Sequence, residues 1–427
     1  MESKKVIKDL QELIEAKVIS EETAEKIQAF YASKQKPKSN KLFLVLAILG
    51  ALLIGLGIIL IIAHNWDELT QATKTIIAFV PLLIGQFLAG YALFKKEDSS
   101  AWREASSAFL FCAVGASISL ISQIYNIPGD VDTYLRTWML LCFPLIYLMR
   151  SSITSLMYLA GITYYACEKG YWTFPVAEPY LYWLMLLLAL PHYYLLIKNK
   201  PHSNFTIFHH WMVPLSLVIC LGTIADKNAE LLFVGYISLF GLLHLVGSLP
   251  FFADQKTRNN GYRIIGTLGT IILLLVLSFD WFWKDLAREE VGVVNIEGGI
   301  SLLLILAAFA LLYQKWQRET TAGIGPLDLV FLLFPVVFFI GMNDSITATI
   351  LVNVTLLAIG LITIKRGADL DHLGVLNFGL LTITALAACR FFDTNISFVI
   401  RGMLFVLVGI GFFAANFWML KRRKEDE

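Results

Sequence analysis

The chain has 427 residues, of which 57% are apolar and only 16% are charged, and its formal net charge at pH 7 is +1. Soluble chains carry about 25% charged residues, and a nucleic-acid binder needs a basic surface that a net charge near zero does not provide. This composition excludes a soluble enzyme, a disordered protein and a nucleic-acid binder. It predicts a membrane protein that crosses the lipid bilayer many times.

Residues 1–40 form the one sizeable polar segment, and they predict a cytoplasmic helical hairpin followed by a basic linker. Apolar residues recur at helical spacing in this segment, and Ser20 is a predicted N-cap with Glu21 and Glu22 in the first turn after it. Such a hairpin either rests on the membrane surface or docks a cytosolic protein, and both roles remain open. We expect residues 41–424 to form a transmembrane domain and residues 425–427 to form a tail.

Apolar runs follow one another along the rest of the chain with short connections, and most of them can cross a ~30 Å hydrocarbon core as a helix. They predict an all-α, polytopic transmembrane helix bundle of about 14 spans, give or take about two, because the runs at 134–149 and 152–167 could form one re-entrant pair. The continuous runs disfavour a β-barrel, whose strands alternate in polarity. The expected spans are 42–63, 75–94, 106–124, 134–149, 152–167, 179–197, 207–223, 230–251, 263–283, 299–314, 327–341, 345–364, 374–390 and 396–420.

The lysine and arginine residues predict the orientation of these spans. Most of the 34 basic residues fall on one side when the amino terminus is placed in the cytoplasm, and an even number of spans returns the basic tail to that side. We therefore expect both termini to be cytoplasmic. The five cysteines form no C-x-x-C pair and the histidines lack metal-ligand spacing, so we predict no metal site, no cofactor and no catalytic residue.

Polar and ionisable residues gather where the expected spans end on the outer side. An ionisable group within the membrane is unfavourable, by about 2.5–3.5 kcal/mol at the middle of a span. Such groups therefore pair with an opposite charge or line a water-filled cavity. Because the planar fork of arginine binds carboxylate and phosphate groups, we predict an outward-facing pocket for an anionic group. The candidate binding residues are Asn65, Asp67, Gln123, Tyr125, Asp130, Asp132, Arg136, Arg390, Asp393 and Arg401.

An alternative is that the acidic residues of this set, together with Asp280, only pair with the three arginines and hold helix ends together. Deeper polar residues are few, and each of them is expected to form an interhelical hydrogen bond: Gln86, His192, His244 and Asn353. Helix breaks at membrane depth would favour a transporter. The candidate positions for such breaks are Pro81, Pro144, Pro191, Pro214 and Pro335.

Three motifs stand at the ends of expected spans: G-L-G-x-I-L-x-x-A-x-N-W-D from Gly55 to Asp67, Q-I-Y-N-x-x-G-D from Gln123 to Asp130, and R-F-F-D from Arg390 to Asp393. With the amino-terminal hairpin, they resemble the bacterial membrane proteins grouped as domain of unknown function family 2157. The resemblance to that domain covers about residues 5–150. It implies a location in the bacterial cytoplasmic (inner) membrane, and it implies no particular activity.

Three functions remain open at this point. The first is a transporter or flippase-like carrier for an anionic or lipid-linked solute. The second is a membrane-embedded enzyme that acts on a lipid-linked substrate at the outer leaflet, with Asp67 or Asp130 as the base or metal ligand. The third is a non-catalytic assembly or sensing protein that recruits a cytosolic partner through residues 1–40. Many spans, short loops and outer arginines favour the carrier.

Overall fold

The computed structural model describes residues 18–33, 66–172, 177–225, 228–252, 255–288, 294–318 and 323–391, with single positions at 14, 16 and 292 and several between 397 and 413. The described residues form helices, turns and short connections, and no strand occurs among them. This confirms the predicted all-α fold class. Residues 1–76 and residues 77–427 form two compact units, which are described separately.

The first unit contains the helix α2, Glu21–Ser33, and the short 3-10 helix η1, Trp66–Glu68. The Ser20 hydroxyl accepts a hydrogen bond from the backbone N–H of Thr23 at 3.3 Å and contacts the Thr23 hydroxyl at 2.8 Å. These contacts confirm the predicted N-cap. Most of the first half of the predicted hairpin, the basic linker and the expected span 42–63 lie outside the described residues.

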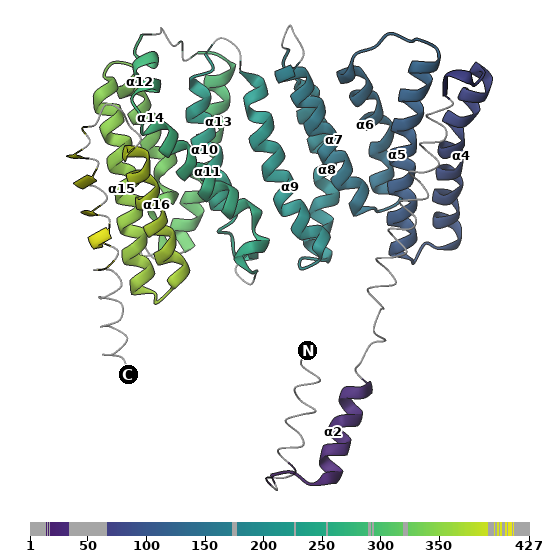
Figure 1. Ribbon diagram of the computed structural model, residues 1–427, viewed down its shortest axis with the longest axis horizontal. Helices are drawn as coiled ribbons and strands as arrows, with labels where there is room; N and C mark the ends of the chain where they lie inside the picture. The colour runs from purple at the N-terminus through teal and green to yellow at the C-terminus, as the bar shows by residue number, and fades with distance from the viewer. Residues whose placement is uncertain are drawn as a thin grey trace. The chain divides into compact units, whose positions relative to one another are not determined.

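The second unit is built from helices that lie side by side (Figure 1). They are α4 (Gln71–Lys95, whose residues up to Ile76 belong to the first unit), α5 (Ser100–Ile124), α6 (Val131–Leu148), α7 (Ser152–Cys167), α8 (Tyr180–Asn199), α9 (Asn204–Leu221), α10 (Leu231–Val246), α11 (Gly261–Leu277), α12 (Trp281–Leu286), α13 (Ile296–Arg318), α14 (Val330–Gly341), α15 (Ser345–Asp369) and α16 (Leu373–Phe391). Short helical segments lie between them: the π-helix η2 (Glu168–Trp172) and the 3-10 helices η3 (Gly222–Ile224), η4 (Pro250–Phe252), η5 (Thr257–Asn259) and η7 (Pro326–Asp328).

In the described part of the chain, 7 helices are long and apolar enough to cross a membrane, namely α4, α5, α8, α9, α13, α15 and α16. The helices α10, α11 and α14 are apolar but shorter. The predicted helical bundle therefore fits, whereas the number of about 14 spans is not confirmed and stays a prediction. One expected span is corrected, because the run 263–283 is divided between α11 and α12 at Ser278.

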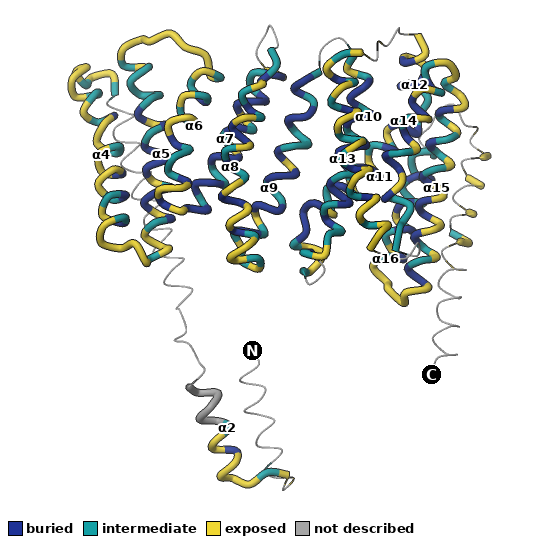
Figure 2. Tube along the Cα trace, turned by 180° about the vertical axis from the view of Figure 1, so that it is seen from behind, coloured by how far each residue is buried: buried dark blue, intermediate teal, exposed yellow. Residues whose placement is uncertain are grey.

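Large apolar side chains remain exposed along the outer faces of these helices. Exposed residues line much of α4, whereas α9 is buried along half of its length (Figure 2). On α4, Phe87 is 73% exposed and Phe94 is 86% exposed, and on α13 Leu303 is 64% exposed. Such surfaces are unfavourable in water and suit contact with hydrocarbon chains.

Two clusters of buried apolar side chains hold the second unit together. The first lies among α5–α11 and includes Met139, Tyr158 and Tyr182, all of which are fully buried. The second lies among α10–α16 and includes the fully buried Trp283 and Phe331. Groups of polar side chains lie at the two ends of this second cluster.

The pair α10 and α11 depends on a glycine where the two backbones approach closely. A Cβ atom at Gly266 would lie 2.5 Å from the backbone nitrogen of His244 and 2.6 Å from the carbonyl oxygen of Phe240. Because backbone atoms cannot move aside alone, we expect Gly266→Ala to lower the free energy of unfolding by about 1–3 kcal/mol. Thermal unfolding in detergent measures this, with Gly299→Ala, which meets nothing within 4 Å, as the control. Equal unfolding temperatures for Gly266→Ala and the native protein would contradict the close approach.

Candidate functional site

The predicted binding residues fall into three groups according to where the structure places them. Asn65, Asp393 and Arg401 lie outside the described residues. Asp67 is exposed in η1, in the first unit, so its position relative to the second unit is left open. The remaining six lie in the second unit, five of them around the connection between α5 and α6.

The α5–α6 connection carries exposed polar side chains next to two helix ends. Gln123 and Tyr125 stand at the end of α5, and Asp130 is the residue that precedes α6. Asp132 and Arg136 follow in the first two turns of α6 and are partly buried. None of the ion pairs found in the described part of the chain includes Asp130, Asp132 or Arg136. These residues therefore present polar groups to the surface rather than a closed ion-pair network.

Arg390, near the end of α16, contacts the point where α11 ends. Its guanidinium nitrogen donates a hydrogen bond to the Ser278 hydroxyl at 3.0 Å, and its Cζ lies 4.5 Å from the centroid of the Phe279 ring. The first contact joins residues that are 112 positions apart in the sequence. Arg390 thus places a positive charge beside the carboxyl terminus of α11, where the helix dipole favours a cation.

The helix is interrupted between α11 and α12, where side chains donate hydrogen bonds to backbone carbonyl groups. The side-chain amide of Asn353 on α15 donates to the carbonyl of Ser278 at 2.8 Å, and the indole of Trp283 donates to the carbonyl of Leu277 at 2.7 Å. These bonds satisfy carbonyls that the end of a helix leaves unpaired. The contact of Asn353 also confirms its predicted interhelical hydrogen bond. We call the group Ser278, Phe279, Asn353 and Arg390 the Ser278 junction.

None of the five candidate prolines interrupts its helix. Each of the five prolines lies inside a continuous helix, namely α4, α6, α8, α9 or α14. In a packed bundle the one hydrogen bond that a proline removes can be compensated by neighbouring groups, so the helix continues. Near the Ser278 junction, Asp280 pairs with Lys284 one turn along α12, a partner that the sequence did not predict.

The structure does not bring the α5–α6 residues together with Arg390. The helices α6 and α16 lie in opposite halves of the array of helices, and α7–α9 lie between them in both views (Figures 1 and 2). Both groups nevertheless stand at the same side of the array, since the α5–α6 connection and α12 are found at the upper side of Figure 1. Two separate polar regions therefore face that side.

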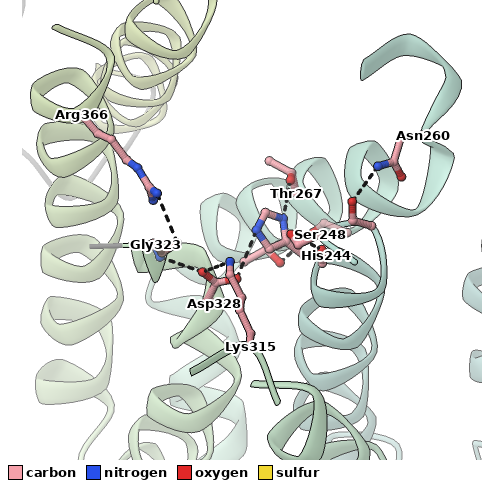
Figure 3. A network of polar contacts seen from close by, with 12 residues as sticks. His244, Ser248, Asn260, Thr267, Lys315, Gly323, Asp328 and Arg366 are labelled. Atoms are coloured by element: carbon pink, nitrogen blue, oxygen red, sulfur yellow. Dashed lines mark hydrogen bonds and ion pairs between the residues drawn. The ribbon is translucent and has the colours of Figure 1, made fainter. Parts of the chain in front are cut away.

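A second group of charged residues lies at the other end of α11, and His244 is its one member that the sequence predicted to form an interhelical contact (Figure 3). Asp328, in η7, is only 1% exposed, and its Oδ2 accepts hydrogen bonds from the Lys315 ammonium group at 2.8 Å and from the Gly325 backbone N–H at 2.7 Å. Its Oδ1 lies 3.5 Å from Nε2 of His244 on α10. Nδ1 of His244 lies 2.8 Å from the hydroxyl of Thr267 on α11, which confirms the predicted interhelical hydrogen bond.

We call the group Asp328, Lys315, His244 and Thr267 the Asp328 cluster. A further contact lies beside it. Arg366 on α15 donates to the carbonyl of Gly323 at 3.2 Å, close to the turn that holds Asp328. Lys315 stands near the end of α13, so the cluster connects α10, α11, α13, η7 and α15. A carboxylate just inside the apolar run 327–341, and a lysine directly after the run 299–314, were the sequence signals for it.

Two further buried polar groups tie helices of the second unit together. The Glu104 carboxylate on α5 accepts hydrogen bonds from the backbone N–H groups of Ser152 and Ile153 and from the hydroxyl of Ser151, at the start of α7. Between α7 and α9, Nε2 of His209 lies 2.9 Å from the Ser155 hydroxyl. The first group joins α5 to α7, and the second joins α7 to α9.

Two further polar residues named from the sequence are His192 on α8 and Gln86 on α4. Nε2 of His192 is buried without a hydrogen-bond partner, so the predicted bond is wrong for that nitrogen, and Gln86 is exposed on α4. Within the described ranges, no group of three His, Cys, Asp or Glu side chains could hold a metal ion.

Lipid-exposed apolar helices with charged groups buried between them define this chain as a helical membrane protein that crosses the bilayer several times. Residues 11–155 match the model of a family described as "Predicted membrane protein (DUF2157)". The match confirms the resemblance, and it contains the first two motifs as well as Glu104 and its partners at the start of α7. No curated protein and no solved structure matches the chain.

Proposed function

We propose that this protein is a carrier that moves an anionic or lipid-linked solute across the membrane and binds it at the Ser278 junction. The observation that carries the proposal is the contact of Arg390 with the break between α11 and α12. Carriers commonly bind their solutes where a membrane helix is discontinuous, because the unwound backbone and helix ends offer polar groups at membrane depth. Arginine supplies the charge and the paired donors that a phosphate or carboxylate needs.

The Asp328 cluster supports a carrier with a polar site at each end of its helices. Thr267 and Ser278 are both on or directly after α11, about 16 Å apart along the helix axis at 1.5 Å per residue. Buried apolar side chains of α14, such as Phe331, Phe334 and Phe338, pack against the neighbouring helices. A carrier needs two such ends, which close in turn so that the solute meets only one side of the membrane at a time.

The proposal keeps the orientation that the basic residues predict. The Ser278 junction then faces outward, the Asp328 cluster faces the cytoplasm, and both termini are cytoplasmic in the bacterial inner membrane. The α5–α6 residues Gln123, Tyr125, Asp130, Asp132 and Arg136 then form a second outward polar surface. We assign to this surface the first encounter with the solute, and Asn65, Asp67, Asp393 and Arg401 stay predicted binding residues.

Solute movement in proteoliposomes tests the proposal. The protein is reconstituted with two probes in separate experiments, radiolabelled inorganic phosphate and a fluorescent phosphatidylglycerol whose flipping is followed by chemical quenching. We expect the native protein to accelerate at least one probe, and Arg390→Ala to slow it by about 10- to 100-fold, because a charge-assisted hydrogen-bond partner contributes about 1.5–3 kcal/mol.

The matched control is Arg288→Ala, which removes an exposed arginine directly after α12 and should leave the rate unchanged. Arg390→Lys keeps the charge without the planar fork, and we expect an intermediate rate. If neither probe moves faster than in protein-free liposomes, or if Arg390→Ala moves it as fast as the native protein, the proposal is wrong.

A further inference from the structure

The membrane helix α4 carries an exposed polar side chain, that of Gln86, well inside its length. Gln86 precedes Lys95, the last residue of α4, by nine positions, which is roughly 13 Å along the helix axis. No hydrogen bond of this side chain is found in the described part of the chain. A glutamine side chain is too short to reach water from that depth, so α4 leaves an amide group among hydrocarbon chains.

Another face of α4 is already occupied by α5. The buried residues of this face are small, namely Ala78, Gly85, Ala89 and Ala92, and the Ser117 hydroxyl on α5 donates to the carbonyl of Ala78 at 2.7 Å. Small side chains allow two membrane helices to approach closely. On its other side α4 stands at the edge of the array of helices in both views (Figures 1 and 2). The face that carries Gln86 is therefore open to a further partner.

Gln86 belongs to a row of residues at spacings of three and four, which we call the Gln86 stripe: Phe79, Leu83, Gln86, Gly90 and Phe94. Phe79, Leu83 and Phe94 are 42%, 61% and 86% exposed, and a Cβ atom at Gly90 would meet nothing within 4 Å. Such spacing keeps the residues on one face, and two helices that pack along their length use the same pattern. The glycine one turn from Gln86 lets a second backbone come close to the amide.

A second copy of this chain satisfies the amide by symmetry. Two copies inserted in the same orientation and related by a twofold axis place their α4 helices parallel, with the two Gln86 side chains at the same depth. An amide group both donates and accepts, so two facing glutamines complement each other, whereas a lipid chain offers neither donor nor acceptor. We propose that the Gln86 stripe is the interface of a homodimer, with reciprocal hydrogen bonds between the two Gln86 side chains. This interface is separate from the Ser278 junction and does not depend on the carrier.

Disulfide cross-linking of the full-length protein in membrane vesicles tests the geometry while Gln86 is intact. Leu83→Cys, in a background whose native cysteines are replaced, is oxidised with copper phenanthroline, and we expect a covalent dimer because equivalent positions of the stripe face each other across the axis. The matched control is Ile84→Cys, since Ile84 is 47% exposed at the same depth but lies outside the stripe. It should cross-link at least about tenfold more slowly than Leu83→Cys.

Energy transfer between labelled copies in liposomes, followed as the protein is diluted with lipid, tests the role of the amide. We expect Gln86→Leu to weaken the dimer by about 5- to 30-fold, because a hydrogen bond between membrane helices contributes about 1–2 kcal/mol in model peptides. Gln314→Leu, which removes an exposed glutamine near the end of α13, should leave the dimer unchanged.

Three results would overturn the homodimer. The first is a native protein that stays monomeric at every dilution, which would mean that another partner meets the Gln86 amide. The second is a Leu83→Cys variant that cross-links no faster than Ile84→Cys. The third is a Gln86→Leu variant that associates as tightly as Gln314→Leu.

Discussion

Alanine in place of Asp328 is expected to lower the free energy of unfolding by about 3–5 kcal/mol. Asp328 is almost completely buried, and its carboxylate is the partner of Lys315, whose side chain is only 14% exposed. The alanine variant leaves the ammonium group buried without its counter-charge and the Gly325 N–H without its acceptor. Chemical unfolding in detergent, followed by tryptophan fluorescence, measures the loss.

A double-mutant cycle separates the ion pair from simple loss of packing. We expect Asp328→Leu combined with Lys315→Met to be more stable than either single variant, because replacing both partners of a buried pair by apolar groups is often neutral. Asp285→Ala is the matched control, since its pair with Arg288 is exposed and should contribute less than about 1 kcal/mol. A loss at Asp328→Ala no larger than at Asp285→Ala would contradict this account of the cluster.

Alanine in place of Glu104 is expected to destabilise the start of α7 by about 3 kcal/mol. The carboxylate accepts two backbone N–H groups, from Ser152 at 3.0 Å and Ile153 at 2.9 Å, and a hydroxyl from Ser151 at 2.6 Å. All of these groups are buried or partly buried, so the alanine variant leaves donors unpaired at about 1–3 kcal/mol each, and it also removes a negative charge from a helix amino terminus. Thermal unfolding gives the total loss.

Hydrogen exchange shows whether the loss of stability arises at α7 itself. We expect a peptide covering residues 150–156 to take up deuterium faster in Glu104→Ala, while peptides from α15 keep their native rate. Glu104→Gln should also be destabilised, because its amide NH2 faces backbone donors in place of one carboxylate oxygen. Native exchange in residues 150–156 of Glu104→Ala would contradict the proposed capping of α7.

The helices could be predicted from the sequence because each apolar run is a local feature. The expected span 179–197 appears as α8, Tyr180–Asn199, and the span 345–364 appears within α15, Ser345–Asp369. The division of the run 263–283 could not be predicted, since its cause lies elsewhere in the chain. Asn353 accounts for part of that division, by a contact that spans 75 positions. No local signal near Ser278 distinguishes this break from the prolines, which were the more obvious candidates.

The candidate site shows the same limit. Arg390 stands out in the sequence because a charge at the end of an apolar run is costly, but its contact with Ser278 depends on how α11 and α16 pack. Asp328 and Lys315 are only 13 positions apart, and a buried pair between them could have been proposed from their places at the ends of two runs. His244 joins them from a distant helix, so the full cluster required the structure.

Access to Ser278 from water distinguishes a carrier from a fixed structural contact, because a carrier must expose its binding site. Ser278 is fully buried, so a cysteine there can react with a membrane-impermeant maleimide only when the site opens. The measurement uses Ser278→Cys in a background whose five native cysteines are replaced, with Thr133→Cys as the exposed control and Ser155→Cys as the buried control. We expect Ser278→Cys to be labelled from the outer side, more slowly than Thr133→Cys and far faster than Ser155→Cys. If Ser278→Cys in the folded protein is as unreactive as Ser155→Cys from both sides, the Ser278 junction is a fixed structural contact and the carrier account is wrong.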